Sequence, residues 1–266
     1  MAGLMLAVCI GGCSTLAGVT TAAVGGRQVE SVVAGQGLPV VVLENGLGGT
    51  LDWWAKVLPE VARESTVLAY NRAGYGKSDA VAQARDGTHV VHELRSLLQA
   101  RKLPPPYVLV GHSLGGLYMQ LFARQYPREV AALVLVDATH PEQLRGAGDP
   151  QGWPAWLKLT FGMLTSDTAK QELAALDATG QIVLGLPVDP AVPVWVLSAL
   201  HPMAQSSALA DDANRKRAAL ATLYPGARQV WVDSGHGIPM EKPEAVVAAI
   251  REAVRAAGRD VGRLQR

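Results

Sequence analysis

The chain has few cysteines and almost no net charge. Its 266 residues include only two cysteines, Cys9 and Cys13, so the remainder can form no disulfide bond, thiol nucleophile or cysteine metal site. Lysine and arginine total 24 against 23 aspartate and glutamate residues, a net charge of +1. This balance gives no reason to expect nucleic acid or an acidic polymer as a partner.

Charge is also missing from residues 1–26. An apolar start followed by small residues and Cys13 resembles a bacterial lipoprotein signal in which Cys13 is acylated, although such signals normally open with a basic residue. A plain cleaved signal, an uncleaved anchor and a misplaced start are the alternatives. We expect export (periplasmic, secreted or lipid-anchored, with membrane attachment through Cys13 in the last case) over a cytoplasmic location. Residues 1–26 are therefore set apart from a single folded domain at 27–266.

Short apolar runs rich in valine and leucine recur along that domain. They lie at residues 40–43, 66–70, 107–110, 132–136, 194–197 and 229–232. They do not alternate with polar residues, which is typical of strands buried on both faces. Helical spacing of apolar residues fills the intervals at 88–100, 117–125 and 244–256. This alternation predicts a doubly wound α/β fold with a mostly parallel sheet. Residues 29–33 are a candidate antiparallel edge strand.

Residues 139–190 interrupt the alternation, because they contain no convincing buried strand. We interpret them as a small helical cap inserted after the strand that ends at Asp137. Trp153, Trp156 and Phe161 lie in this segment, and we expect them to line an apolar substrate pocket. The alternative is that they only pack the cap's own small core.

The most informative motif has the form G-x-S-x-G and runs from Gly111 to Gly115, with Ser113 at its centre. A strand candidate precedes it and a helical pattern follows it, as this motif requires. The glycines allow a sharp strand-to-helix turn with the serine at its apex, and the helix N-terminus points N–H groups at developing negative charge. The motif therefore predicts that Ser113 is a nucleophile. The alternative is a glycine-rich turn with an idle serine.

The segment 111–116 resembles the nucleophile elbow of α/β-hydrolase esterases and lipases, and the resemblance extends over about residues 35–250. Segment 45–49 stands where that family carries its oxyanion loop, with Asn45 in place of the usual histidine. Segment 71–78 resembles the family's D-R-x-G-x-G-x-S turn, with Asn71 in place of aspartate, and 233–236 resembles its late histidine loop. The resemblance implies an α/β-hydrolase fold with His236 as the general base.

The backbone N–H groups of Leu47 and Leu114 are the expected oxyanion hole. The acid that orients His236 is harder to assign, because no carboxylate follows the strand candidate at 194–197, where many family members place it. Asp137 ends the strand after the nucleophile helix, a position that some members use, so we predict Asp137 as the acid. The alternatives left open are Asp211, Asp212, Glu142 and Asp233, or no acid at all.

Together these residues predict a serine hydrolase that cleaves a carboxylic ester or related acyl bond of a small apolar substrate through an acyl-enzyme. No metal or cofactor is implied. Thioesterase, lactonase, C–C hydrolase and cofactor-free haloperoxidase activities also use a serine and stay open, whereas family members that are dehalogenases or epoxide hydrolases carry aspartate at the elbow. A low-turnover ligand-binding protein on the same fold is the alternative from another class. The substrate and the oligomeric state are left open.

Overall fold

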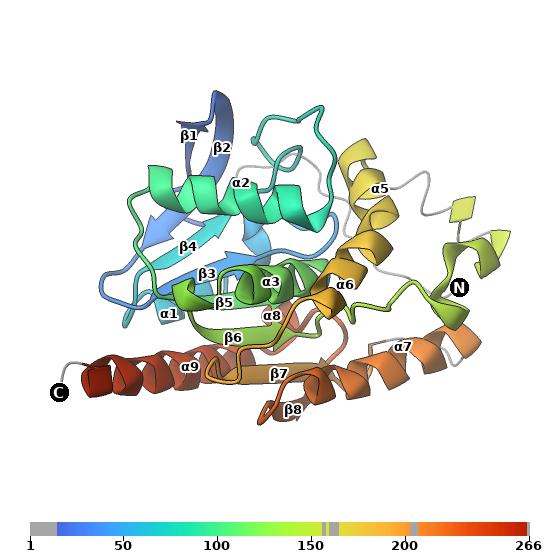
Figure 1. Cartoon of the computed structure of the whole chain (residues 1–266). Coiled ribbons are helices and arrows are strands. Elements are labelled where there is room, and N and C mark those ends of the chain that lie inside the picture. The colour runs from blue at the N-terminus through green and yellow to red at the C-terminus, as the bar shows by residue number, and fades with distance from the viewer. Residues whose placement is uncertain (1–14, 156–157, 160–164, 203–206, 265–266) are drawn as a thin grey trace.

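The computed structural model describes residues 15–155, 158–159, 165–202 and 207–264. An eight-stranded sheet with the order β1-β2-β4-β3-β5-β6-β7-β8 forms its centre (Figure 1). β1 pairs with β2 and β2 with β4 in antiparallel fashion, and all other pairs are parallel. The strands are β1 (Thr20–Val24), β2 (Arg27–Ala34), β3 (Val40–Glu44), β4 (Val67–Tyr70), β5 (Tyr107–His112), β6 (Val130–Val136), β7 (Val194–Ala199) and β8 (Arg228–Val232).

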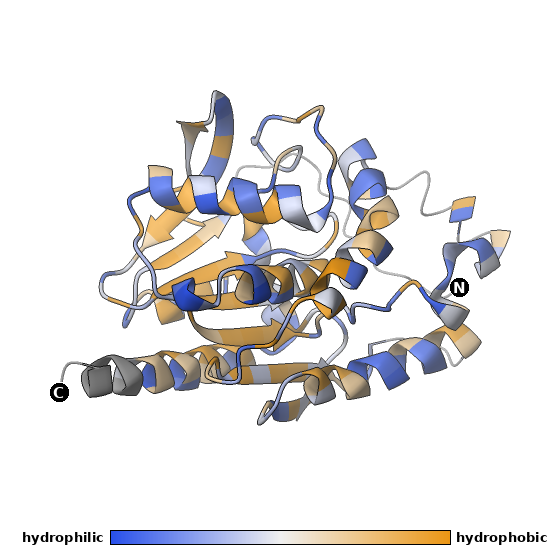
Figure 2. Ribbon diagram, in the orientation of Figure 1, coloured by the Kyte–Doolittle hydropathy of each residue, from blue (hydrophilic) through white to orange (hydrophobic). Residues whose placement is uncertain are grey.

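Each apolar run in the sequence is a strand of this sheet, and β3, β4, β5 and β7 are buried along their whole length. The doubly wound, mostly parallel fold predicted from the sequence is therefore confirmed. Figure 2 shows these central strands as mostly hydrophobic between more polar helix surfaces. They lack alternation because helices cover both of their faces.

The predicted boundary at residue 27 is wrong. Thr20–Val24 form β1, which is the edge strand, so β2 is covered by a neighbour on each side. Leu16 is also buried, and the Thr15 backbone N–H donates to Asp52 over 2.8 Å. The folded body thus includes residues that the sequence assigned to a signal. Cys13 lies outside the described residues.

Two helices, α2 (Gly87–Ala100) and α3 (Leu114–Gln125), cover one face of the sheet and share a core with it. α1 (Leu58–Val61) and α9 (Pro243–Leu264) pack on the other face. The start of α2 follows from its sequence, because the Asp86 side chain accepts the His89 backbone N–H at 3.1 Å and so caps the helix. Shorter helices, η1 (Leu51–Trp54), η2 (Pro127–Glu129) and α8 (Ile238–Glu241), join the elements.

Between β6 and β7, the described residues form short helices joined by turns and loops. They include η3 (Gly146–Gly148), η4 (Pro150–Gly152), α5 (Asp167–Ala174) and α6 (Leu176–Gly185). Figure 1 shows α6 beside α3, with α5 adjoining it. α7 (Ala208–Ala219) and η5 (Leu220–Leu223) lie between β7 and β8. None of the helices in the described ranges is long and apolar enough to cross a membrane.

Parallel strands end at one edge of a sheet, and that edge is where this fold class places its sites. β5 is followed there by Ser113, β6 by Asp137, and β8 by the loop that carries His236. The topology alone therefore brings three residues together that are widely separated in the sequence.

Candidate active site

Ser113 lies at the apex of the turn between β5 and α3 and has φ 53° and ψ −123°. This is a backbone conformation that side-chain-bearing residues rarely adopt. The Ser113 N–H donates to Val136 O at 3.1 Å, and its carbonyl accepts the N–H groups of Gly116 and Thr139, each at 2.9 Å. These three bonds tie the strained residue to β6 and to α3, and so hold the serine at a fixed place on the edge.

The glycine at 115 is required by the close packing of this turn. A Cβ on Gly115 would collide with the carbonyl oxygens of Glu44 and Asn45 at the end of β3. Because backbone cannot move aside as a flexible side chain can, a larger residue would push α3 away from the sheet. The motif's glycine thus sets how closely the nucleophile turn approaches the loop after β3.

Three side chains form a hydrogen-bonded chain at this edge. The Ser113 hydroxyl donates to His236 Nε2 at 3.0 Å, and His236 Nδ1 donates to Asp137 Oδ2 at 2.5 Å. The His236 side chain is 43% exposed, whereas the Asp137 side chain is fully buried. The structure therefore brings together the three residues that the sequence predicted as nucleophile, base and acid, with the base open to a substrate.

Asp137 is held as a carboxylate although it is buried. Burial alone would raise its pKa, but hydrogen bonds from His236, the charge of Arg217 and the backbone N–H of Ala199 together lower the pKa below its ordinary value. The Asp137 backbone has φ 41°, and its N–H donates to Leu197 O at 2.7 Å. An ionised acid at this point can fix the tautomer of His236 and stabilise its protonated form.

The other carboxylates considered from the sequence have different partners. Asp212 binds Lys216 at 2.6 Å and Arg215 at 3.1 Å along α7, and Asp211 is exposed on the same helix. Asp233 pairs with His201 at 3.1 Å in an exposed position. Among the described residues, Asp137 is the carboxylate that His236 contacts.

The loop after β3 lies directly against the nucleophile, since a Cβ built on Gly46 would be 3.0 Å from Ser113 Cβ. Leu47, the next residue, is half-buried, and Leu114 follows the serine at the start of α3. The Asn45 side chain donates to Tyr70 O at 2.9 Å, so it ties the loop to β4. The loop that contains Leu47 thus lies beside Ser113, and the oxyanion hole of Leu47 and Leu114 stays a prediction.

Arg72 fixes the orientation of that loop. Its guanidinium donates to the carbonyl oxygens of Asn45 at 2.6 Å and Gly46 at 2.9 Å, and it pairs with Glu44 at 2.6 Å. Burial opposes the charge of Arg72, yet the carboxylates of Glu172 and Glu44 raise the pKa of its guanidinium. With both carbonyls held by Arg72, the loop has its peptide planes set before any substrate arrives.

Glu172 links the cap to the same arginine. This residue of α5 is fully buried, accepts from Arg72 Nε at 2.9 Å and Nη2 at 2.8 Å, and accepts the Tyr75 hydroxyl at 2.9 Å. The sequence pattern marked the Arg72 turn, but it gave no sign that a cap residue would neutralise it. A lone acidic residue on a polar helix looks like any surface glutamate.

His112 precedes Ser113 in the chain and contacts the loop that carries His236. Its Nε2 donates to the backbone carbonyl of His236 at 2.9 Å, and its ring lies 4.8 Å from the His236 ring. The Trp53 ring of η1 also stacks on His112, with the ring centroids 5.1 Å apart. Burial, and to a smaller extent the neighbouring His236, lower the pKa of His112 to about 3, so this imidazole stays neutral. Its hydrogen bond to the His236 carbonyl supports the loop that carries His236.

Asn71 replaces the family's aspartate for a local reason. Its amide donates to the buried Glu30 carboxylate at 2.7 Å and accepts the Leu51 N–H at 2.7 Å. An aspartate here would face Glu30 with a second negative charge and no donor. The Asn71 amide therefore joins this turn to β2 and to η1.

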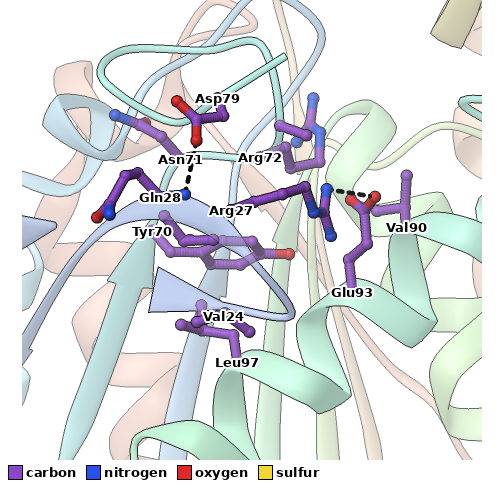
Figure 3. A pocket seen from close by; sticks show the side chains of 12 residues that line it. Val24, Arg27, Gln28, Tyr70, Asn71, Arg72, Asp79, Val90, Glu93 and Leu97 are labelled. Atoms are coloured by element: carbon purple, nitrogen blue, oxygen red, sulfur yellow. Dashed lines mark hydrogen bonds and ion pairs between the residues drawn. The ribbon is translucent and has the colours of Figure 1, made fainter. Parts of the chain in front are cut away.

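The predicted pocket residues are only partly covered by the structure. Trp153 is half-buried, and its indole N–H donates to Gly148 O at 3.0 Å within the cap. Trp156 and Phe161 lie outside the described residues, so the pocket they were expected to form stays a prediction. A different pocket lies between the β1–β2 hairpin and α2, where Arg27 pairs with Glu93 at 2.9 Å (Figure 3). Its lining does not include Ser113, His236 or Asp137.

Within the described part of the chain, no group of three or more histidine, cysteine or acidic side chains is arranged to hold a metal ion. A family model described as "alpha/beta hydrolase fold" matches residues 39–185. The chain belongs to the α/β-hydrolase fold family. The resemblance noted in the sequence, and the expectation of an α/β-hydrolase, are thereby confirmed.

Two curated relatives of this α/β-hydrolase come from Bacillus subtilis (strain 168). The uncharacterized protein YqjL is 34% identical over 97 residues, which cover 36% of this chain and 38% of YqjL. The uncharacterized protein YbdG is 28% identical over 126 residues, covering 47% of this chain and 39% of YbdG. The chain thus spans well under half the length of these relatives.

Solved structures share the fold over nearly all of the chain. A thermophilic esterase from Thermogutta terrifontis superposes with a TM-score of 0.62 at 24% identity, covering 90% of this chain and 97% of the esterase. The enol-lactonase from Burkholderia xenovorans LB400 superposes with a TM-score of 0.60 at 20% identity, covering 89% of this chain and 100% of the lactonase. At these identities the likeness establishes the fold alone.

Proposed function

We propose that this α/β-hydrolase cleaves a carboxylic ester, or a related acyl bond, of a small apolar substrate through an acyl-enzyme on Ser113. The observation that carries the proposal is the continuous hydrogen-bonded chain from the Ser113 hydroxyl at 3.0 Å to His236, and from His236 to Asp137 at 2.5 Å. That an esterase and an enol-lactonase share the fold supports an ester-type bond.

In the proposed reaction, Ser113 attacks the substrate carbonyl while His236 takes its proton. Asp137 keeps the His236 proton on Nδ1, so that Nε2 is free to accept, and then stabilises the imidazolium. The N–H groups of Leu47 and Leu114 stabilise the oxyanion of the tetrahedral intermediate. His236 returns the proton to the leaving alcohol, and water releases the acid by the same steps.

The test is the reactivity of Ser113 itself. An activated serine reacts quickly with a fluorophosphonate probe, whereas an idle hydroxyl does not. We expect the wild-type protein to be labelled at Ser113 and to hydrolyse p-nitrophenyl esters. Ser113→Ala should abolish labelling and lower ester turnover by several orders of magnitude. Ser96→Ala, a substitution on α2 away from the elbow, is the matched control and should leave both unchanged.

A wild-type protein that is folded but neither reacts with the probe nor turns over any ester would refute the proposal. A low-turnover binding protein on this fold would give that result. Near-normal turnover in a folded Ser113→Ala variant would refute the assignment of the nucleophile.

Substrate size is the second part of the proposal. We assign the apolar acyl or alcohol pocket to the cap, with Trp153, Trp156 and Phe161 as its lining. Single changes of these residues to alanine should alter the ranking of p-nitrophenyl esters of increasing chain length. If each variant slows all esters equally, or none, the three side chains pack the cap and do not select the substrate.

A further inference from the structure

Arg217 contacts the buried Asp137 carboxylate, on the oxygen that His236 does not use. This residue of α7 donates from Nε to Asp137 Oδ1 at 2.5 Å, and its side chain is only 12% exposed. Its Nη1 donates to Asn214 Oδ1 at 2.8 Å, one turn back on the same helix. An aspartate that only has to orient a histidine needs no cation, so this contact calls for a separate explanation.

We propose that Arg217 is a positioning residue for the Asp137 carboxylate, which it holds so that one oxygen stays directed at His236. This inference rests on the proposed function, because it deepens the role of the same site. It concerns a residue that no sequence motif of the site contains.

The positioning follows from how the two carboxylate oxygens of Asp137 are divided. Oδ1 accepts the Ala199 backbone N–H at 3.0 Å and the Arg217 Nε–H. Oδ2 is left to accept His236 Nδ1. With two donors on Oδ1, from β7 and from α7, the carboxylate cannot rotate without breaking both bonds. Oδ2 therefore stays aimed at the imidazole.

The neighbours of Arg217 on α7 have other partners and provide the control. Lys216 donates to Arg145 O at 2.6 Å and to Asp212 at 2.6 Å, and it anchors the helix to the cap. Arg215 is 68% exposed and pairs with Asp212 at 3.1 Å. Arg215→Gln therefore removes a positive charge from the same helix without touching Asp137.

The experiment compares Arg217→Gln, Arg217→Met and Arg217→Lys with Arg215→Gln and the wild type. The first readout is kcat and KM for a p-nitrophenyl ester. The second is the NMR resonance of the His236 Nδ1 proton in a Ser113→Ala background, which reports the hydrogen bond to Asp137. Loss of the Arg217 Nε–H should lower kcat by roughly ten-fold with little change in KM, and should shift the resonance to higher field.

Arg217→Lys keeps the charge but loses the planar Nε–H, so its kcat should fall as in the neutral variants. Arg215→Gln should leave kcat, KM and the resonance unchanged. Wild-type kcat and a wild-type resonance in any folded Arg217 variant would overturn the proposal, and three variants keep the test open if one of them does not fold.

The two proposals fail in distinguishable ways. A wild-type protein without esterase activity or probe labelling would refute the proposed function, but the NMR resonance would still report whether Arg217 keeps Asp137 directed at His236. An active enzyme whose Arg217 variants keep the wild-type kcat and resonance would refute only the inference about Arg217.

Discussion

His112 should make the protein progressively less stable as the pH falls below neutrality. Burial lowers its pKa from 6.5 to about 3, so the folded state holds it neutral, whereas the unfolded chain takes up a proton near 6.5. The unfolded state therefore binds more protons between these two values, and the free energy of unfolding decreases as the pH is lowered. The stability contributed by a neutral His112 is complete above about pH 6.5.

The slope of this loss is about 1.4 kcal/mol per pH unit for one proton. Between pH 7 and pH 5, His112 should thus lower the free energy of unfolding by about 2 kcal/mol. His112→Gln removes the titration but keeps an N–H that can donate to the His236 carbonyl. The variant loses the stack on Trp53, so it starts less stable at pH 7, yet it should lose about 2 kcal/mol less than the wild type on acidification.

The measurement is urea unfolding of wild type, His112→Gln and His92→Gln at a series of pH values, followed by circular dichroism. His92 is exposed on α2, and its variant controls for the loss of any histidine. The slopes of unfolding free energy against pH are compared, so effects shared by all three proteins cancel. Equal losses of stability in the wild type and His112→Gln between pH 7 and pH 5 would refute the prediction.

Two further predictions concern the charged groups of the site and the cap. Asp137→Asn should lower kcat by about 10⁴-fold in steady-state ester assays, because the amide favours the wrong imidazole tautomer. Asp211→Asn and Asp212→Asn should change kcat little. The reverse outcome would assign the acid to α7. Glu172→Gln should lower the free energy of unfolding by about 3 kcal/mol, because it leaves a buried arginine short of a counter-charge. Asp177→Asn, at an exposed pair on α6, should cost less than about 1 kcal/mol in the same denaturant titration, and equal losses in the two variants would contradict the argument.

The sheet could be predicted from the sequence because its central strands are apolar on both faces. β1 was missed for the opposite reason, since Thr20–Val24 has small and polar residues and is mostly exposed. As an edge strand it is held by its backbone pairing with β2, and backbone pairing leaves little trace in composition. The lack of charge before Arg27 then favoured a signal over a strand.

The candidate site could be located from the sequence to the extent that strand ends determine it. Ser113 and Asp137 each follow a buried strand directly, so topology brings them together. Arg217 and Glu172 could not be found in this way, because each reaches the site from a helix whose packing depends on the cap. Their sequence neighbourhoods, rich in charge and alanine, are typical of solvent-facing helices.

The buried pairing of Glu172 with Arg72 bears on how this protein could be re-engineered. A cap inserted between two strands looks like a module that could be exchanged to change specificity. Here, however, α5 carries the counter-charge for the arginine that holds the Asn45 and Gly46 carbonyls. A transplanted cap that lacks an acidic residue at this position would change the pocket. It would also leave Arg72 with less counter-charge, so the loop of Asn45 and Gly46 beside Ser113 would be held less firmly. Chimaeras of this protein should therefore transfer Glu172 together with the rest of the graft.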